Sequence, residues 1–249
     1  MKILITGANG FLGRNLIDRL INIDEKYIIY KYDRESTLEE LETYTKDCDF
    51  VFNFAAVHRP KDVSEFDKVN HLLFSTILDL LQTNNNTCPV LYTSSIQATN
   101  GSEYGDSKLS AEKDLLDYAM RTGAKAIIYR LTNIYGRWAT PNHHSVVATF
   151  CYNLANDLPI TITDENHVMN FYYIDDVIDS FIGQLDNSVL PCEDGIYRLQ
   201  EEKIYSITLG KLAEYLIYFR DCVKNNVKPY LENEIKRTLY LTYLSYVKK

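Results

Sequence analysis

The feature that most constrains this chain is a glycine-rich turn, TGANGFLG, at residues 6–13. It follows the apolar run Ile3–Ile5 and precedes the amphipathic segment Asn15–Ile23, so we predict a strand, a tight turn and a helix in that order. Bare backbone N–H groups at the start of a helix, together with its partial positive charge, suit the pyrophosphate of a dinucleotide. The predicted cofactor-binding residues of this turn are Gly7, Asn9, Gly10, Phe11, Leu12 and Gly13.

The pair Asp33-Arg34 follows a second predicted strand, Tyr27–Tyr32. Asp33 lies 20 positions after Gly13, where a dinucleotide-binding fold places the side chain that meets the adenine ribose. An aspartate at this place accepts a hydrogen bond from the ribose 2′-hydroxyl and favours NAD, whereas an arginine pairs with the 2′-phosphate of NADP. The two adjacent residues therefore leave the choice of cofactor open.

Further apolar runs alternate with helical segments along the first half of the chain. Residues 50–56 form a continuous apolar stretch, which is typical of a strand buried in a parallel sheet. The alternation predicts an α/β fold with a Rossmann-type doubly wound parallel sheet, followed by a small C-terminal substrate lobe. In the later part of the chain we predict a helix from Val146 to Leu158 and short elements at 197–199 and 208–220. Because the carboxyl ends of parallel strands share one edge, we expect four residues on the ligand-binding edge. They are Ala55, Ala56, Ser95 and Asn133.

The composition argues against several classes of function. The formal net charge is −8, and no block of basic residues offers a nucleic-acid surface. The five cysteines are scattered without a C-x-x-C pair, which argues against a zinc site or a disulfide framework and fits a reducing cytosol. The adjacent histidines 143 and 144 lack a third ligand, so no metal is expected. We predict no leader peptide. No apolar run approaches the length of ~20 residues that a membrane span needs. We therefore predict a cytoplasmic location.

Tyr104 and Lys108 are the candidate proton-transfer groups. Four positions apart on a predicted helix, they share one face. The phenol of tyrosine has an unperturbed pKa of about 10, and a nearby ammonium group lowers that pKa by favouring the phenolate. Lys108 can also bind the nicotinamide ribose, and the Ser95 hydroxyl at a strand end can hold a substrate oxygen beside Tyr104. We therefore expect a tyrosine with a lowered pKa that exchanges protons with an alcohol or ketone.

These residues belong to a larger set of motifs. The set comprises T-G-x-x-G-x-x-G at 6–13, N-x-A-A at 53–56, S-S at 94–95, Y-x-x-x-K at 104–108, R-x-x-N-x-Y-G at 130–136 and Y-I-D-D-V at 173–177. With it the chain resembles the extended short-chain dehydrogenase/reductase family, whose members modify nucleotide sugars. The resemblance implies a catalytic triad of Ser95, Tyr104 and Lys108. It also implies cofactor contacts at Ala55, Ala56 and Leu131.

Longer runs at 94–98, 104–108 and 141–151 are similar to the reductase half of capsular-polysaccharide enzymes of the route to UDP-N-acetyl-fucosamine. This likeness implies reduction of a UDP-4-keto-6-deoxy-N-acetylhexosamine, with NADP(H) favoured and NAD(H) as the other possible cofactor. It also implies a homodimer formed through helices at 66–82 and 104–121. The substrate-binding residues inferred from it are Arg59, Ser95, Gln97, Asn133, Asn142, His143 and Ser145.

Two features depart from many members of the family. Only eight residues separate Ser95 from Tyr104, and Asn170 stands where many relatives carry arginine. No cupin domain, which the capsular enzymes carry, is expected within residues 1–249. Two alternatives stay open: a nucleotide-sugar 4-epimerase with tightly bound NAD, and a non-catalytic cofactor-binding protein. In the expected organisation all 249 residues form one unit of this family, with 1–134 and 171–187 as the dinucleotide-binding core and 135–170 and 188–249 as the substrate lobe.

Overall fold

The computed structural model describes residues 1–23, 27–56, 71–143 and 145–247. The chain divides into two compact units, Met1–Leu131 with Ser180–Arg198 and Thr132–Asp179 with Leu199–Lys249. The division expected from the sequence differs at three stretches, because residues 132–134 and 171–179 fall in the second unit and residues 188–198 in the first. The first unit is built on a parallel sheet, and the second combines a small mixed sheet with helices.

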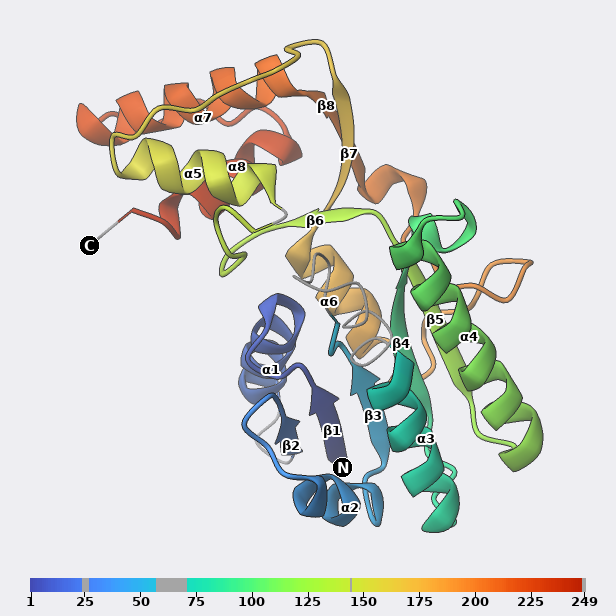
Figure 1. Ribbon diagram of the computed structural model, residues 1–249. Helices are drawn as coiled ribbons and strands as arrows, with labels where there is room; N and C mark the ends of the chain where they lie inside the picture. Colours follow the sequence, from blue (N-terminus) through green and yellow to red (C-terminus); the bar gives the residue numbers. More distant parts are fainter. Residues whose placement is uncertain (24–26, 57–70, 144, 248–249) are drawn as a thin grey trace. The chain divides into compact units, whose positions relative to one another are not determined.

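The first unit alternates strands with helices, as the sequence predicted (Figure 1). Its elements are β1 (Lys2–Thr6), α1 (Phe11–Ile23), β2 (Ile28–Tyr32), α2 (Leu38–Thr45), β3 (Phe50–Asn53), α3 (Leu73–Thr83), β4 (Val90–Ser95), the 3-10 helix η2 (Ile96–Thr99), α4 (Glu103–Thr122) and β5 (Ala126–Leu131). The end of α6 (Ile174–Ile182) also belongs to this unit. The predicted start of the third helix, at residues 66–70, lies outside the described residues.

The five strands of the first unit form one sheet in the order β2-β1-β3-β4-β5. All neighbouring strands in it are parallel, and at the carboxyl end Ser95 of β4 lies opposite Leu131 of β5. The strand order reverses between β1 and β3, so their carboxyl ends flank the crevice where doubly wound sheets bind ligands. The predicted fold class is confirmed.

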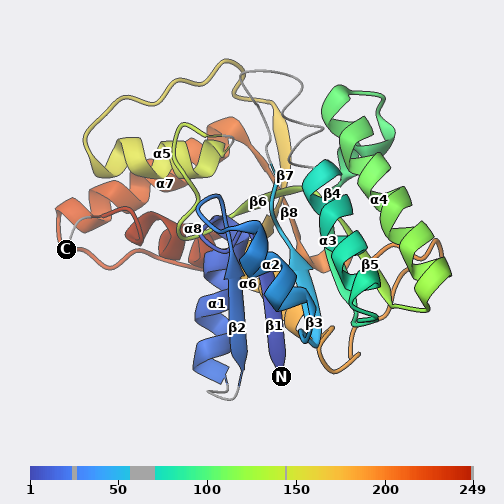
Figure 2. The same cartoon turned by 60° about the horizontal axis from the view of Figure 1, so that its bottom comes forward.

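Both faces of this sheet are covered by apolar side chains. On one face, residues of α2, α3 and α4 pack in a single cluster with Leu4 of β1 and Val51 of β3. Figures 1 and 2 show α3 and α4 side by side. On the other face, the ring of Phe181 stacks on Phe54 at 5.4 Å and meets Tyr129 edge-on at 4.9 Å between centroids. Burial on both faces explains why the strands read as continuous apolar runs.

The second unit joins a three-stranded sheet to a group of helices. Its elements are β6 (Asn133–Tyr135), α5 (Val146–Ala155), β7 (Val168–Tyr173), the first part of α6, the 3-10 helix η3 (Glu201–Lys203), β8 (Ile204–Thr208), α7 (Leu209–Lys224) and α8 (Glu234–Leu244). β7 runs parallel to β6 and antiparallel to β8. In Figure 1, α5, α7 and α8 lie together as one group. Tyr135 of β6 and Thr238 of α8 share a buried hydrogen bond of 2.6 Å, which ties the strands to this group.

Four late segments differ from the sequence prediction. The helix predicted from Val146 to Leu158 ends at Ala155, and Asp157 just beyond it takes a left-handed conformation with φ of 56°. The element predicted at 197–199 is reduced to an isolated bridge between Tyr197 and Tyr129. Residues 208–220 contain the end of β8 and most of α7, whose first turn is capped by the Thr208 hydroxyl. The sequence analysis did not predict α8.

Candidate active site

The glycine-rich turn connects β1 to α1 as predicted, and its glycines are required by close backbone contacts. Gly7 has a φ of +64°, and a Cβ built on it would lie 2.9 Å from the Ala55 nitrogen. A Cβ on Gly13 would lie 2.3 Å from the Gly7 carbonyl oxygen. A larger side chain at either place would force α1 away from the turn or the turn away from the end of β3. The turn is therefore held close to the strand ends by the absence of these two side chains.

The start of α1 is suited to an anion. The helix has 13 residues, and its first turn contains no acidic side chain. The exposed Asn9 and Gly10 precede Phe11, Leu12 and the buried Gly13. A helix N-terminus without a competing carboxylate presents its backbone N–H groups and partial positive charge to a phosphate. These residues fit the pyrophosphate of a dinucleotide.

Asp33 lies beside this turn, although it follows Asn9 by 24 positions in sequence. Its Oδ2 accepts a hydrogen bond of 2.6 Å from the Asn9 backbone N–H, and its Oδ1 accepts one of 2.8 Å from the Arg34 N–H. The Arg34 residue is exposed. The structure therefore brings together the turn, a carboxylate and a cation, which are the groups expected around an adenine ribose.

The ends of β1 and β3 are joined by a buried polar contact. The Thr6 hydroxyl donates to the Asn53 side-chain oxygen at 2.5 Å, and the Ala55 N–H donates to the same hydroxyl at 3.3 Å. Ala55 and Ala56, both half-buried, carry only methyl groups at this edge. The edge that begins at the glycine turn thus continues with small side chains, as a flat nucleotide requires.

Ser95 ends β4 and meets Tyr104, the second residue of α4. A hydrogen bond from Ser95 to Tyr104 lowers the pKa of the phenol, but burial outweighs it and raises the pKa to about 12. The sequence analysis expected a lowered pKa for Tyr104; in the cofactor-free protein this expectation is wrong, because desolvation disfavours the phenolate. Tyr104 is consequently a protonated phenol near neutral pH, which is the form that can donate a proton.

The short connection between Ser95 and Tyr104 is made possible by a glycine. The Ser95 hydroxyl caps η2 by accepting from the Gln97 N–H at 3.1 Å, and α4 starts four residues after η2 ends. A Cβ on Gly105 would lie only 2.1 Å from the Gln97 carbonyl oxygen. Gly105 therefore lets the first turn of α4 pack directly on η2, which brings Tyr104 to Ser95 without a longer loop.

Lys108 is buried one turn further along α4. Its Nζ donates to the Thr93 carbonyl oxygen at 2.9 Å and lies 4.9 Å from the Tyr92 ring centroid and 5.8 Å from that of Tyr104. Burial lowers the pKa of the ammonium group to about 8, against the opposing influence of Glu112. The sequence analysis did not identify Tyr92, the Thr93 carbonyl or Glu112 as part of this site. Glu112 could have been identified from its position four residues after Lys108, which places both side chains on one face of the helix.

The remaining predicted site residues are distributed over the chain. Arg59 lies outside the described residues. Leu131 is buried at the end of β5, opposite Ser95, and Gln97 is exposed on η2. In the second unit, Asn133 donates to the Asn170 carbonyl at 3.2 Å, and the Ser145 hydroxyl caps α5 by accepting from the Ala148 N–H. Asn142 and His143 are exposed in the loop before α5, with Asn142 in a left-handed conformation.

Comparison with known proteins identifies the family. Residues 3–190 match the NAD dependent epimerase/dehydratase family, which covers the sheet and the whole Ser95, Tyr104, Lys108 arrangement. The chain belongs to this family. It is 39% identical over 251 aligned positions, 99% of its own length, to UDP-2-acetamido-2,6-beta-L-arabino-hexul-4-ose reductase of Pseudomonas aeruginosa. It spans 65% of that relative's length.

Two solved structures show how far the likeness extends. The capsular polysaccharide assembling protein CapF from Staphylococcus aureus is 35% identical and superposes with a TM-score of 0.89, over 100% of this chain and 66% of that one. UDP-glucose 4-epimerase from Thermotoga maritima superposes with a TM-score of 0.79 over 99% of this chain and 98% of that one. At 19% identity, this second likeness shows the shared fold alone.

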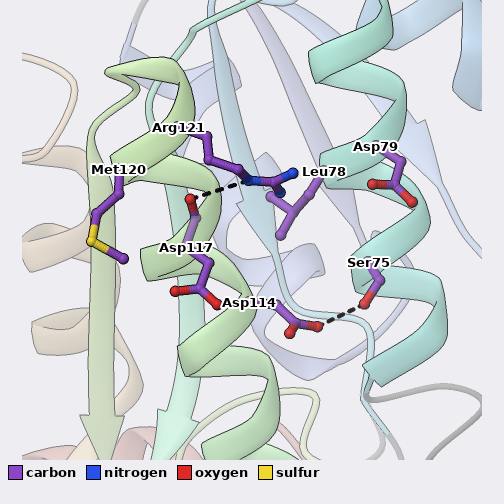
Figure 3. Close-up of a pocket in the computed structure, with 7 residues that line it drawn as sticks. All are labelled: Ser75, Leu78, Asp79, Asp114, Asp117, Met120 and Arg121. Carbon is purple, nitrogen blue, oxygen red and sulfur yellow. Dashed lines mark hydrogen bonds between the residues drawn. The ribbon is translucent and has the colours of Figure 1, made fainter.

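A separate hollow of about 440 Å³ lies between α3 and α4, on the side of these helices shown in Figure 3. Its lining residues are Ser75, Leu78, Asp79, Asp114, Asp117, Met120 and Arg121. None of Ser95, Tyr104 and Lys108 contributes to it, so it is not part of the candidate active site.

Within the described residues, no group of three or more potential ligands is placed to hold a metal ion. No helix of that part of the chain combines the length and the apolar character needed to cross a membrane.

Proposed function

We propose that this protein is an NAD(P)H-dependent reductase that converts a UDP-4-keto-6-deoxy-N-acetylhexosamine into the 4-hydroxy sugar, in the synthesis of sugar nucleotides for capsule or O-antigen. The observation that carries the proposal is the 39% identity to a UDP-hexul-4-ose reductase along 99% of this chain. The contacts of Tyr104 with Ser95 and of Lys108 with Thr93 support it, because one protonated phenol suffices for a ketone reduction.

In this reaction the chain supplies the proton and the positioning. A reduced nicotinamide, when bound, supplies the hydride that adds to the keto carbon. Tyr104 donates its phenolic proton to the carbonyl oxygen, so that C=O becomes CH–OH. The Ser95 hydroxyl holds the same oxygen and stabilises the phenolate left on Tyr104. Lys108, as an ammonium ion, stabilises that phenolate and binds the nicotinamide ribose.

Further parts of the proposal concern binding of the sugar nucleotide. We assign the glycine turn, Ala55, Ala56 and Leu131 to the cofactor. The proposed substrate contacts are Arg59, Ser95, Gln97, Asn133, Asn142, His143 and Ser145. In this proposal residues 1–134 and 171–187 act as the dinucleotide-binding core, and residues 135–170 and 188–249 as the substrate lobe. The protein works in the cytoplasm, where nucleotide sugars and reduced nicotinamides are available.

We also propose a homodimer formed through α3 and α4. Two apolar side chains of α4, Leu116 and Met120, are 47% and 77% exposed. Met120 lies next to the hollow between the two helices (Figure 3). Exposed apolar side chains on paired helices are suited to burial against the same helices of a second copy. Light scattering of the purified chain measures the mass directly, and a monomer at micromolar concentration would contradict this part of the proposal.

The reaction itself is tested with a UDP-4-keto-6-deoxy-N-acetylhexosamine and NADPH. We expect one NADPH consumed for each keto sugar, followed by nicotinamide absorbance, and a product heavier by two hydrogen atoms in mass analysis. We expect the configuration at the other ring carbons to be retained, since a single proton donor next to one carbonyl is all that the site provides. The control is the same mixture with Tyr104→Phe protein.

The opposite result would favour the epimerase alternative. A 4-epimerase keeps its cofactor and returns the hydride within each cycle. Protein that purifies with bound NAD and interconverts two UDP-sugars without net consumption of NADPH would overturn the reductase proposal. Protein that binds the cofactor but turns over none of the keto sugars in a panel would favour the non-catalytic alternative.

For the cofactor we propose a preference for NADP(H). The exposed Arg34 can pair with a 2′-phosphate and stack on the adenine. The Asp33 carboxylate would repel that phosphate, but the Asn9 and Arg34 N–H groups already offset part of its charge. We expect Arg34→Ala to raise the KM for NADPH about tenfold or more and to change the KM for NADH little. Lys31→Ala is the matched control, because Lys31 is an exposed cation on β2, the strand that leads to Arg34. Equal effects of Arg34→Ala on both cofactors would assign NAD(H) instead.

A further inference from the structure

The most deeply buried carboxylate near the candidate site belongs to Glu112. It lies on α4, one helical turn after Lys108, and is 2% exposed. A buried carboxylate is stable only when charged or hydrogen-bonding groups surround it. Glu112 has such groups on both oxygens. Its Oε1 accepts from the Ser94 hydroxyl at 2.5 Å and from Arg130 Nε at 2.9 Å, and its Oε2 accepts from Arg130 Nη2 at 2.6 Å.

The two partners of Glu112 come from neighbouring strands. Ser94 of β4 and Arg130 of β5 lie directly opposite each other in the parallel register. The next pair in that register is Ser95 and Leu131, at the ligand-binding edge. Glu112 therefore fastens the carboxyl ends of both strands to α4, one residue before the strand end that carries Ser95. No other described carboxylate makes this connection.

Three contacts now join α4 to the end of β4. Tyr104 meets Ser95, Lys108 Nζ donates to the Thr93 carbonyl oxygen, and Glu112 accepts from Ser94. The three helix residues are four positions apart, so they form one stripe on the helix. The first two contacts involve the proposed proton donor and the proposed ribose ligand. The third contact, between Glu112 and Ser94, is buried and holds the same two elements, α4 and β4, together.

We propose that Glu112 is a positioning residue of this active site, which acts through Ser94 and Lys108 and does not touch the substrate. This inference rests on the proposed roles of Ser95, Tyr104 and Lys108. With Arg130 it fixes the distance between the strand end and the helix. Its negative charge also supports the ammonium form of Lys108 in a buried position.

The groups around Lys108 make the second role measurable. From β4 it meets the Thr93 carbonyl and the Tyr92 ring, and from α4 the Tyr104 ring and the Glu112 charge. From α3, the uncharged ring of Phe74 stacks on Tyr92 at 4.8 Å. From β5, Arg130 pairs with both oxygens of Glu112. Among these described neighbours, Glu112 is the one carboxylate that opposes the desolvation of Lys108.

The test follows the titration of Lys108 in the cofactor-free protein by NMR of isotope-labelled lysine side chains. The Lys108 signal is assigned as the one missing from Lys108→Met protein. Glu112→Gln should lower the titration midpoint by about one pH unit or more. Arg130→Gln leaves the carboxylate without its cation and should raise the midpoint. Ser94→Ala removes a hydrogen bond but no charge and should leave it near that of the wild type.

Opposite shifts in two variants of one ion pair cannot come from general destabilisation. An unchanged midpoint in both Glu112→Gln and Arg130→Gln would overturn the inference. If one of the two does not fold, the other still decides the sign. This readout needs neither substrate nor turnover, so it stands apart from any failure of the proposed reaction.

A kinetic readout tests the positioning role. Ser94→Ala, which keeps all charges, should lower kcat about tenfold with little change in KM, because Ser95 and Tyr104 are then less well aligned. Ser94→Thr, which restores a hydroxyl, should recover most of the loss. Wild-type kcat in Ser94→Ala would contradict the positioning role.

Discussion

Replacing Tyr104 by phenylalanine should lower kcat by a factor of about 10²–10⁴ and leave the Kd of the cofactor nearly unchanged. Phenylalanine keeps the ring whose centroid lies 5.8 Å from Lys108 Nζ, and so keeps the packing of the site. It removes the phenolic proton and the hydrogen bond with Ser95. Because burial raises the pKa of Tyr104 to about 12, this phenol is protonated near neutral pH, as the proposed reduction requires of its donor.

A second tyrosine on the same helix provides the control. Tyr118 donates its hydroxyl to the Asn86 carbonyl at 2.9 Å, at the far end of α4 from Tyr104. Tyr118→Phe should cost some stability, through the loss of that hydrogen bond, and leave kcat unchanged. The two variants therefore separate the loss of a hydroxyl from the loss of the proton donor. If Tyr104→Phe turned over at the wild-type rate, Tyr104 would be removed from the mechanism.

The sheet and the cofactor edge could be predicted because their signals are local. Apolar runs such as 50–56 are enough to predict buried strands, and their alternation with helical segments predicts a doubly wound parallel sheet. The turn at residues 6–13 and Asp33 were predicted from fixed spacing, and the Asn9–Asp33 hydrogen bond brings the two together. Tyr104 and Lys108 share a face simply because they are four residues apart on a helix.

The parts that could not be predicted depend on contacts between distant residues. η2 exists because Ser95 caps it and because Gly105 leaves room for the Gln97 carbonyl, and neither fact is visible in a hydrophobic pattern. The raised pKa of Tyr104 depends on how deeply the phenol is buried. The Glu112–Arg130 pair needs the register of β4 and β5, which places Ser94 opposite Arg130. Spacing along α4 places Glu112 on the face of Lys108, but the sequence analysis did not identify it, and its partners lie on two other elements.

Lys108 gives the protein a pH dependence with a defined sign. Burial lowers the pKa of its ammonium group to about 8, so the group is charged below that pH and neutral above it. In the proposed mechanism the charged form is the one that binds the ribose hydroxyls and stabilises the Tyr104 phenolate. We therefore expect the affinity of the cofactor-free protein for NADPH to hold at neutral pH and to fall as the pH rises through about 8. Quenching or enhancement of nicotinamide fluorescence measures this Kd at each pH.

Lys108→Met should weaken cofactor binding about 10- to 100-fold, as the loss of charge-assisted hydrogen bonds predicts, and lower kcat further. The fall in affinity near pH 8 should disappear, because the group that titrates there is gone. Methionine fills a similar volume and leaves no buried charge to desolvate, so thermal unfolding should show a folded protein. Lys113→Met, an exposed lysine of the same helix, is the matched control and should keep wild-type binding and the same pH dependence. If Lys108→Met bound NADPH as tightly as the wild type at neutral pH, the proposed ribose contact would be wrong, and the role of Lys108 would be confined to Tyr104.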